Sequence, residues 1–89
     1  MKKNGLHIND LGTKCWYKDG FLHRDDGPAI TYPDGRQYWY KKGKYHRDDG
    51  PAIIYPDGDQ RWFKDDIMYE PSAHELMVWK MHEKERTTH

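Results

Sequence analysis

Short runs of alternating apolar and polar residues, separated by turn residues, make up most of this chain. The run Lys14–Lys18 places Trp16 on one side and Tyr17 on the other, as in a β-strand whose side chains alternate between two faces. Similar runs predict strands at Lys14–Lys18, Ala29–Tyr32, Gln37–Lys41, Ala52–Tyr55 and Gln60–Lys64, with brief segments at Phe21–His23 and Lys44–His46. Because consecutive runs are joined by short turns, we expect an antiparallel meander.

Turn residues recur between these runs. Tyr32–Gly35 and Tyr55–Gly58 both read YPDG, in which proline fixes φ, aspartate bonds the local backbone and glycine takes the left-handed conformation. Gly20 and Gly43 follow aromatic runs and allow positive φ in tight hairpin turns. The turn residues therefore predict β-hairpins.

The chain repeats itself with a period of 23 residues. Repeat 1, residues 13–35, reads TKCWYKDGFLHRDDGPAITYPDG, and repeat 2, residues 36–58, reads RQYWYKKGKYHRDDGPAIIYPDG, with sixteen of 23 positions identical. A partial repeat 3 covers residues 59–69, and residues 1–12 are expected to form a loop or an edge strand. A short fixed period is typical of repeat proteins, whose units are stabilised by stacking on their neighbours.

The segment after repeat 3 predicts one helix over residues 72–86. Ser72 and Glu75 have the spacing of a capping box. An imperfect apolar stripe follows and includes Leu76, Met77 and Trp79. We expect the helix to cap the array, to dock on a partner or to pair two protomers into a homo-oligomer. The chain is thus predicted to be one domain, residues 1–89, mainly β with one C-terminal α-helix.

Composition narrows the class of protein. Charged residues form 34% of the chain and hydrophobic residues 35%, a balance that would suit disorder, but aromatic residues reach 15%. Lys plus Arg equals Asp plus Glu at 15 each, which disfavours nucleic-acid binding because no basic surplus is present. Cys15 is the single cysteine in the sequence, so it can form neither an internal disulfide nor a metal-binding motif of paired cysteines. No apolar run resembles a signal peptide or a membrane span, so we expect a cytoplasmic protein without a cofactor.

Both faces of the predicted strands carry an aromatic ladder at the repeat period. One ladder consists of Tyr17, Tyr40 and Phe63. The other consists of Trp16, Trp39 and Trp62. Lys and Gln flank the tryptophans, which predicts that this face is half-exposed or covered by another element. The tryptophan ladder is therefore either packing between repeats or an aromatic strip for a protein partner.

The string HRDDGPA occurs in both repeats, at residues 23–29 (loop 1) and 46–52 (loop 2), and three interpretations stay open. In the first, the string shapes the loop, since Gly-Pro redirects the backbone, Asp caps local N–H groups and Arg pairs with a carboxylate. In the second, the two loops form a ligand-binding surface, because Arg binds phosphate and aromatic rings stack on bases. The residues of that surface would be His23, His46, Arg24, Arg47, Asp25, Asp48, Tyr17 and Tyr40.

The third interpretation is catalysis or metal binding. His23 with Asp25, and His46 with Asp48, have the composition of acid–base pairs. One histidine per repeat does not assemble the three or four ligands that a metal needs. The segment 74–78 fails the HExxH zinc pattern, so no metal site and no catalytic residue are predicted.

The combined pattern WYxxGxxHRxDGPA resembles the short β-hairpin repeats of many small bacterial and phage proteins, which are similar to MORN-type repeats. The resemblance covers residues 13–69 and departs from ordinary MORN repeats in the HRDD string and in repeat 3, where Asp66 replaces the turn glycine and the loop is missing. It implies a non-catalytic interaction module, and some bacterial relatives are described as antitoxins or immunity-like proteins.

We therefore expect a non-enzymatic protein-binding module, a stoichiometric inhibitor of the antitoxin or phage counter-defence kind. The expected partner-binding residues are Trp16, Trp39, Trp62, Arg24, Arg47 and Trp79. The alternative is a small homo-oligomer that sequesters a nucleotide or another phosphate-bearing signal molecule on the loop residues.

Overall fold

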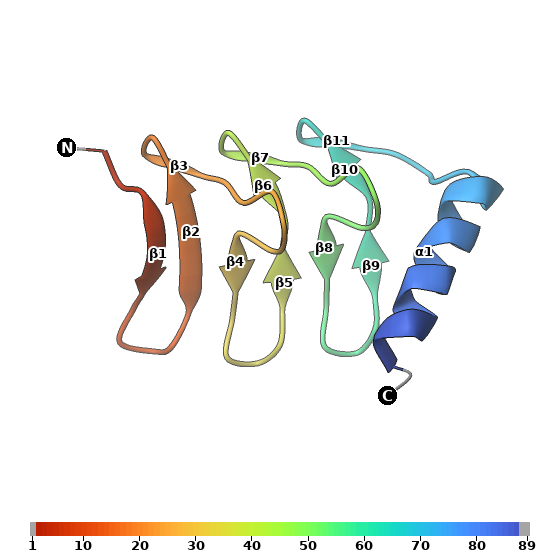
Figure 1. The fold of residues 1–89 in the computed structure, drawn as a ribbon, viewed down its shortest axis with the longest axis horizontal. Helices are drawn as coiled ribbons and strands as arrows, with labels where there is room; N and C mark the ends of the chain where they lie inside the picture. The colour runs from red at the N-terminus through yellow and green to blue at the C-terminus, as the bar shows by residue number, and fades with distance from the viewer. Residues whose placement is uncertain (1, 88–89) are drawn as a thin grey trace.

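The structure is a computed structural model that describes the backbone of residues 2–87 and the side chains of residues 2–81. Antiparallel hairpins stand side by side in a row, and one helix lies beside the last of them (Figure 1). The molecule is elongated, with extents of 43 × 29 × 20 Å. The predicted mainly-β meander with one C-terminal helix is confirmed.

The strands form one long sheet and two small ones, all antiparallel. The long sheet has the order β1-β2-β4-β5-β8-β9, with β3 paired to β2. Its strands are β1 (Gly5–Ile8), β2 (Lys14–Lys18), β3 (Phe21–Leu22), β4 (Ile30–Thr31), β5 (Gln37–Tyr38), β8 (Ile53–Ile54) and β9 (Gln60–Arg61). The small sheets are the hairpins β6 (Tyr40–Lys41) with β7 (Lys44–Tyr45) and β10 (Phe63–Lys64) with β11 (Ile67–Met68). Residues 1–12 thus contribute the edge strand β1.

The predicted strands Gln37–Lys41 and Gln60–Lys64 are each interrupted at their tryptophan. The N–H of Trp39 donates to the carbonyl of Ala52 in loop 2 at 2.6 Å. The residues before Trp39 pair with β4 and β8, whereas those after it pair with β7. The strand therefore changes neighbours at the tryptophan, a change that the alternating sequence pattern does not reveal.

The hairpin turns follow the prediction and extend it to repeat 3. Gly20 and Gly43 take φ of 84° and 79°, as expected. Asp66, at the position of these glycines, also takes a positive φ of 67°. Its Oδ1 accepts the N–H of Tyr45 in the neighbouring hairpin at 2.7 Å, which helps to offset the left-handed backbone. The loss of glycine in repeat 3 therefore does not prevent the turn.

The same backbone hydrogen bonds recur from hairpin to hairpin. Within hairpins, the N–H groups of His23, His46 and Tyr69 donate to the carbonyls of Trp16, Trp39 and Trp62. Between hairpins, the N–H groups of Gly43 and Asp66 donate to the carbonyls of Leu22 and Tyr45, each at 2.9 Å. Each hairpin is therefore bonded to the next at equivalent positions, as expected of stacked units.

The core lies on the tryptophan face of the row. Its buried apolar residues are Ala29, Ile30, Trp39, Ala52, Ile53, Trp62 and Trp79. The prediction of a half-exposed tryptophan strip is wrong for Trp39 and Trp62, which are 7% and 6% exposed. The alternative of a covered face holds for them, because Arg47 stacks on Trp39 and Tyr69, at the end of repeat 3, packs edge-on against Trp62.

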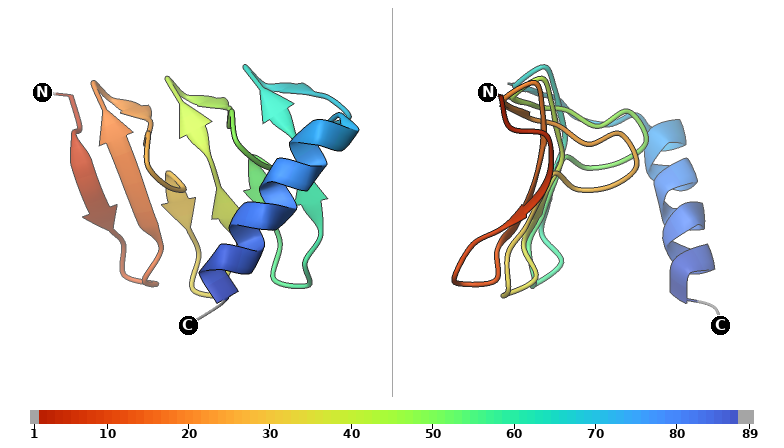
Figure 2. Two further views of the ribbon diagram at one scale, coloured as in Figure 1. Left: turned by 45° about the vertical axis from the view of Figure 1, so that its right-hand side comes forward. Right: turned by 60° about the vertical axis from the view of Figure 1, so that its left-hand side comes forward.

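The helix α1 (Ala73–Thr87) begins at the predicted capping box. The N–H of Ser72 donates to Glu75 Oε1 at 3.0 Å, and the N–H of Glu75 donates to Ser72 Oγ at 3.1 Å. Figure 2 shows that α1 stands on the side of the row toward which the loops project. Trp79 is 3% exposed, so it belongs to the core. Within residues 2–87, α1 is not long and apolar enough to cross a membrane.

Candidate functional site

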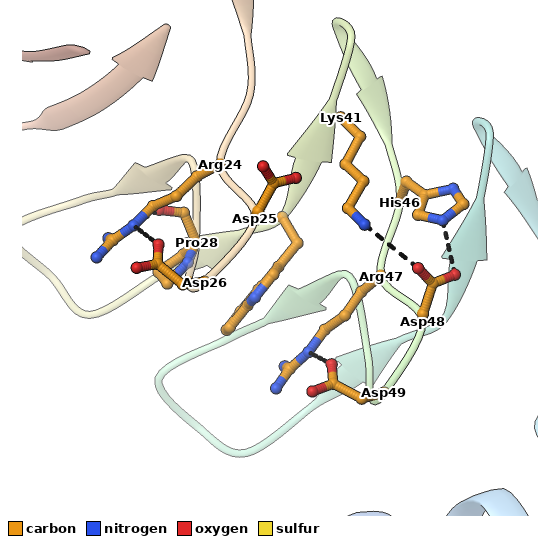
Figure 3. A pocket seen from close by; sticks show the side chains of 11 residues that line it. Arg24, Asp25, Asp26, Pro28, Lys41, His46, Arg47, Asp48 and Asp49 are labelled. Carbon is orange, nitrogen blue, oxygen red and sulfur yellow. Dashed lines mark hydrogen bonds and ion pairs between the residues drawn. The ribbon is translucent and has the colours of Figure 1, made fainter. Parts of the chain in front are cut away.

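Loops 1 and 2 project from the same face of the row and enclose a groove between them. Its volume is about 450 Å³. Arg24 and Asp26 stand on one side of the groove, and Arg47 and Asp49 stand on the other (Figure 3). Trp39 also lines the groove. The two copies of the HRDD string are thus side by side, as the sequence predicts for stacked repeats.

Arg47 in loop 2 is held by two hydrogen bonds and two indole rings. Its Nε donates to Asp49 Oδ1 at 2.9 Å, and its Nη1 donates to the carbonyl of Pro51 at 3.1 Å. The ring centroids of Trp39 and Trp79 lie 4.0 and 4.7 Å from its Cζ. The side chain is 4% exposed, so Arg47 joins the repeat to the helix and is not presented to solvent.

Arg24 in loop 1 repeats this arrangement with one contact fewer. Its Nε donates to Asp26 Oδ1 at 3.0 Å, its Nη1 donates to the carbonyl of Pro28 at 3.4 Å, and its Cζ lies 4.4 Å from the ring centroid of Trp16. The helix supplies no equivalent of Trp79 here, and the Arg24 side chain is 29% exposed. Of the two predicted arginines, Arg24 is therefore the accessible one.

Both loop histidines use both ring nitrogens. His46 Nδ1 accepts the backbone N–H of Asp65 at 3.1 Å, which assigns the ring hydrogen to Nε2, and Nε2 donates to Asp48 Oδ1 at 2.8 Å. The same arrangement joins His23 with Lys42 and Asp25, each at 3.0 Å. Because these bonds link a loop to the turn of the next hairpin, the histidines fasten neighbouring repeats together.

The aspartate side chains of the loops are exposed to solvent, whereas the arginine side chains stack on tryptophan rings. The side chains of Asp25, Asp26, Asp48 and Asp49 are 69%, 87%, 63% and 74% exposed. Beside them, Lys41 donates from Nζ to Asp48 Oδ2 at 3.3 Å. The rim of the groove is therefore acidic, although the HRDD string itself contains as many basic and imidazole groups as acids.

Asp48 gives the loops a dependence on pH. The hydrogen bond from His46, with a smaller contribution from Lys41, holds the pKa of Asp48 below its ordinary value. A lowered pKa stabilises the fold above the unfolded value of about 3.9, and this contribution is lost as pH falls through the lower folded value. We expect Asp48→Asn to reduce stability by less than about 1 kcal/mol at pH 7, since the carboxylate is exposed, and by progressively less as pH falls through the lowered pKa of Asp48. Urea unfolding of both proteins from pH 7 downward measures this, and a difference in stability that does not shrink with falling pH would contradict it.

The predicted residues are only partly brought together. The groove is lined by five of the predicted ligand-binding residues, whereas three others, His23, Tyr17 and Tyr40, do not line it. The five are Arg24, Arg47, Asp25, Asp48 and His46. Tyr17 packs against His7, on the opposite side of β2 from Trp16, and Tyr40 stacks on Tyr45 at 4.5 Å. The groove also contains Asp26, Asp49 and Lys41, which the sequence prediction did not select. The repeat of the DD dipeptide was the available signal for the two aspartates.

Glycine at positions 27 and 50 sets how closely side chains approach the loops. A Cβ added to Gly50 would lie 2.9 Å from Arg47 Cζ and 2.9 Å from Trp79 Cε3, whereas the three atoms nearest to one added to Gly27 all belong to the Arg24 side chain. We expect Gly50→Ala to lower the free energy of unfolding by about 1–3 kcal/mol, because two buried groups must move. Gly27→Ala should stay within about 0.5 kcal/mol, since Arg24 can swing into solvent. Chemical denaturation of the matched pair tests this, and equal losses would contradict it.

Among the residues whose side chains are described, no group of three or more His, Cys, Asp and Glu is arranged to hold a metal ion. No protein-family model, curated protein or solved structure matches this chain.

Proposed function

We propose that this protein is a non-catalytic protein-binding module that acts as a stoichiometric inhibitor, occupying a surface of its partner as antitoxins and phage counter-defence proteins do. The acidic groove between loops 1 and 2 carries the proposal. Four exposed carboxylates stand there in fixed positions, because hydrogen bonds to histidine, arginine and lysine hold them. Side chains that are already ordered lose little entropy on binding, and patterned charge selects a complementary basic surface.

The state of the histidines supports a role without catalysis. A general base needs a nitrogen lone pair directed at the substrate. In His23 and His46 that lone pair accepts a backbone N–H, and the other nitrogen donates to aspartate. The groups with the right composition for acid–base chemistry are thus engaged in holding the repeats together.

The test is recovery of the untagged protein from its own cell lysate, followed by native mass spectrometry. We expect a protein partner in a fixed ratio. The double variant Asp25→Asn with Asp26→Asn should lose that partner, whereas Asp10→Asn, a neutralisation in the β1–β2 turn, should keep it. Circular dichroism of each variant verifies the fold. Turnover of a substrate by the purified protein alone would refute the proposal, and a homo-oligomer with a retained small molecule would favour the nucleotide alternative.

A further inference from the structure

Repeats 1 and 2 are built from the same residues but are covered differently. In repeat 2 the buried positions are Trp39, Arg47, Gly50 and Pro51. In repeat 1 the equivalent, half-exposed positions are Trp16, Arg24, Gly27 and Pro28. The main difference between the two environments is α1, which lies against loop 2 and places Trp79 on it. One copy of the loop is thus occupied and the other is open.

The contact of Trp79 with loop 2 shows what an HRDDGPA loop can bind. The indole lies over the guanidinium of Arg47 at 4.7 Å. It also lies so close to Gly50 that a Cβ there would be 2.9 Å from the indole Cε3. An arginine pre-stacked on one tryptophan, next to a bare glycine backbone, therefore forms a platform for a second indole.

Loop 1 has the same platform, but among the residues whose side chains are described no second ring stacks on its arginine. Arg24 is stacked on Trp16 and fixed by Asp26, as Arg47 is on Trp39 and by Asp49. The three atoms nearest to a Cβ on Gly27 would all belong to Arg24, whereas Trp79 is among the three nearest at Gly50. Arg24 and Gly27 line the groove of about 450 Å³, and this volume is large enough for an aromatic side chain.

We propose that loop 1 is a docking site for an aromatic side chain, above all tryptophan, presented by a basic segment of a partner protein. The inference rests on the proposed function and specifies the chemistry of its contact. The ring of the partner stacks on Arg24, which rests on Trp16, in the way that Trp79 stacks on Arg47, which rests on Trp39. The exposed carboxylates of Asp25 and Asp26 select Lys or Arg beside that ring and repel phosphate. Tryptophan and arginine also dominate interface hot spots.

The probe is a synthetic peptide of residues 70–89, which contains Trp79, the residue that packs on loop 2. Positions 77 and 81 are one helical turn apart and 58% exposed, so Met77→Glu and Met81→Lys joined as a lactam hold the helix without touching the Trp79 side. The peptide carries Trp79 followed directly by Lys80, so the indole that it presents has one cation next to it.

Titration of the ¹⁵N-labelled full-length protein with this peptide tests the proposal. We expect saturable shifts at the Trp16 indole, Arg24 and Gly27. Affinity should fall at least tenfold with Arg24→Ala, and also with Arg24→Lys, which keeps the charge but loses the planar group. A peptide with Trp79→Ala should lose affinity to the same extent, and one with Lys80→Glu several-fold. The full-length Trp79→Ala protein serves as positive control, since it should bind a second equivalent at loop 2.

Several results would overturn the proposal. These are shifts confined to loop 2, equal affinity of the peptide with Trp79→Ala, and no binding to the wild-type protein. If adenosine monophosphate binds at Arg24 more tightly than the peptide does, the docking site at loop 1 is a nucleotide site. If the protein self-associates and Arg24→Ala abolishes this, the site binds a second copy of the chain. If the Arg24→Ala variant still recovers the protein partner from the lysate, the contact at loop 1 is refuted and the proposed function is not. If the peptide binds but the lysate yields no protein partner, the contact at loop 1 is supported and the proposed function is refuted.

Discussion

Arg47→Ala is expected to lower the free energy of unfolding by about 2–4 kcal/mol, and Arg24→Ala by less than about 1 kcal/mol. The two arginines make the same hydrogen bonds to an aspartate and to a proline carbonyl. They differ in burial, at 4% against 29% exposure, and in the second indole on Arg47. A desolvated cation–π contact is worth about 2 kcal/mol and an exposed one about 0.5–1 kcal/mol. Truncating Arg47 also leaves a gap between two buried rings.

Urea unfolding followed by tryptophan fluorescence measures both variants, with an unchanged m-value as the check that the transition is the same. Arg47→Lys and Arg24→Lys are the matched controls, because lysine keeps the charge and removes the planar stacking group. Arg47→Lys should retain only a small part of the wild-type contribution, whereas Arg24→Lys should be close to wild type. Equal losses for the two alanine variants would mean that α1 does not strengthen loop 2.

The hairpins and the helix start were predictable because their signals are local. A turn is specified by the residues within it, so the YPDG segments and the glycines at 20 and 43 locate the hairpins. The capping box of Ser72 and Glu75 is likewise complete within four residues. The third turn, at Asp66, shows the limit of this kind of reasoning, because its acceptor role toward Tyr45 depends on the neighbouring hairpin.

The burial of the tryptophans could not be predicted from the strands alone. Lys and Gln flank Trp39 and Trp62 on the same face of the strands and suggest that this face is exposed to solvent. The residues that bury the two tryptophans lie outside these strands. Arg47, eight residues after Trp39, stacks on its ring, and Tyr69 packs edge-on against Trp62 at 6.2 Å. Neither contact has a periodic signature within one strand.

The groove was predictable in its location and not in its charge. The repeat period places loops 1 and 2 side by side, which the sequence analysis expected. The HRDD string does not show which member of each ion pair faces solvent, and in the fold the carboxylates do. The reason is that the guanidinium of Arg24 or Arg47 is drawn onto a tryptophan ring, which leaves its aspartate at the rim. The histidine bonds were also hidden, since the donors are backbone N–H groups 19 residues away.

Trp79→Ala is expected to release α1 from the array. Trp79 is 3% exposed, and truncation of a buried tryptophan costs about 3–5 kcal/mol. A helix of 15 residues is marginal by itself in water, so the undocked segment should lose much of its helicity. Circular dichroism at 222 nm and amide hydrogen exchange along residues 73–87 measure this. Met77→Ala, in the same helix but 58% exposed, is the control and should leave both signals near wild type.

The release of α1 should also turn loop 2 into an equivalent of loop 1. With the indole gone, Arg47 keeps Trp39 and Asp49 and becomes as exposed as Arg24. Arg47→Ala should then cost no more in the Trp79→Ala background than Arg24→Ala costs in the wild type. A double-mutant cycle between positions 47 and 79 should therefore give a coupling energy of about 1–3 kcal/mol, as expected for residues in direct contact. A coupling energy near zero would mean that Trp79 and Arg47 stabilise the fold independently, and that the indole platform inferred for loop 1 has no energetic counterpart in loop 2.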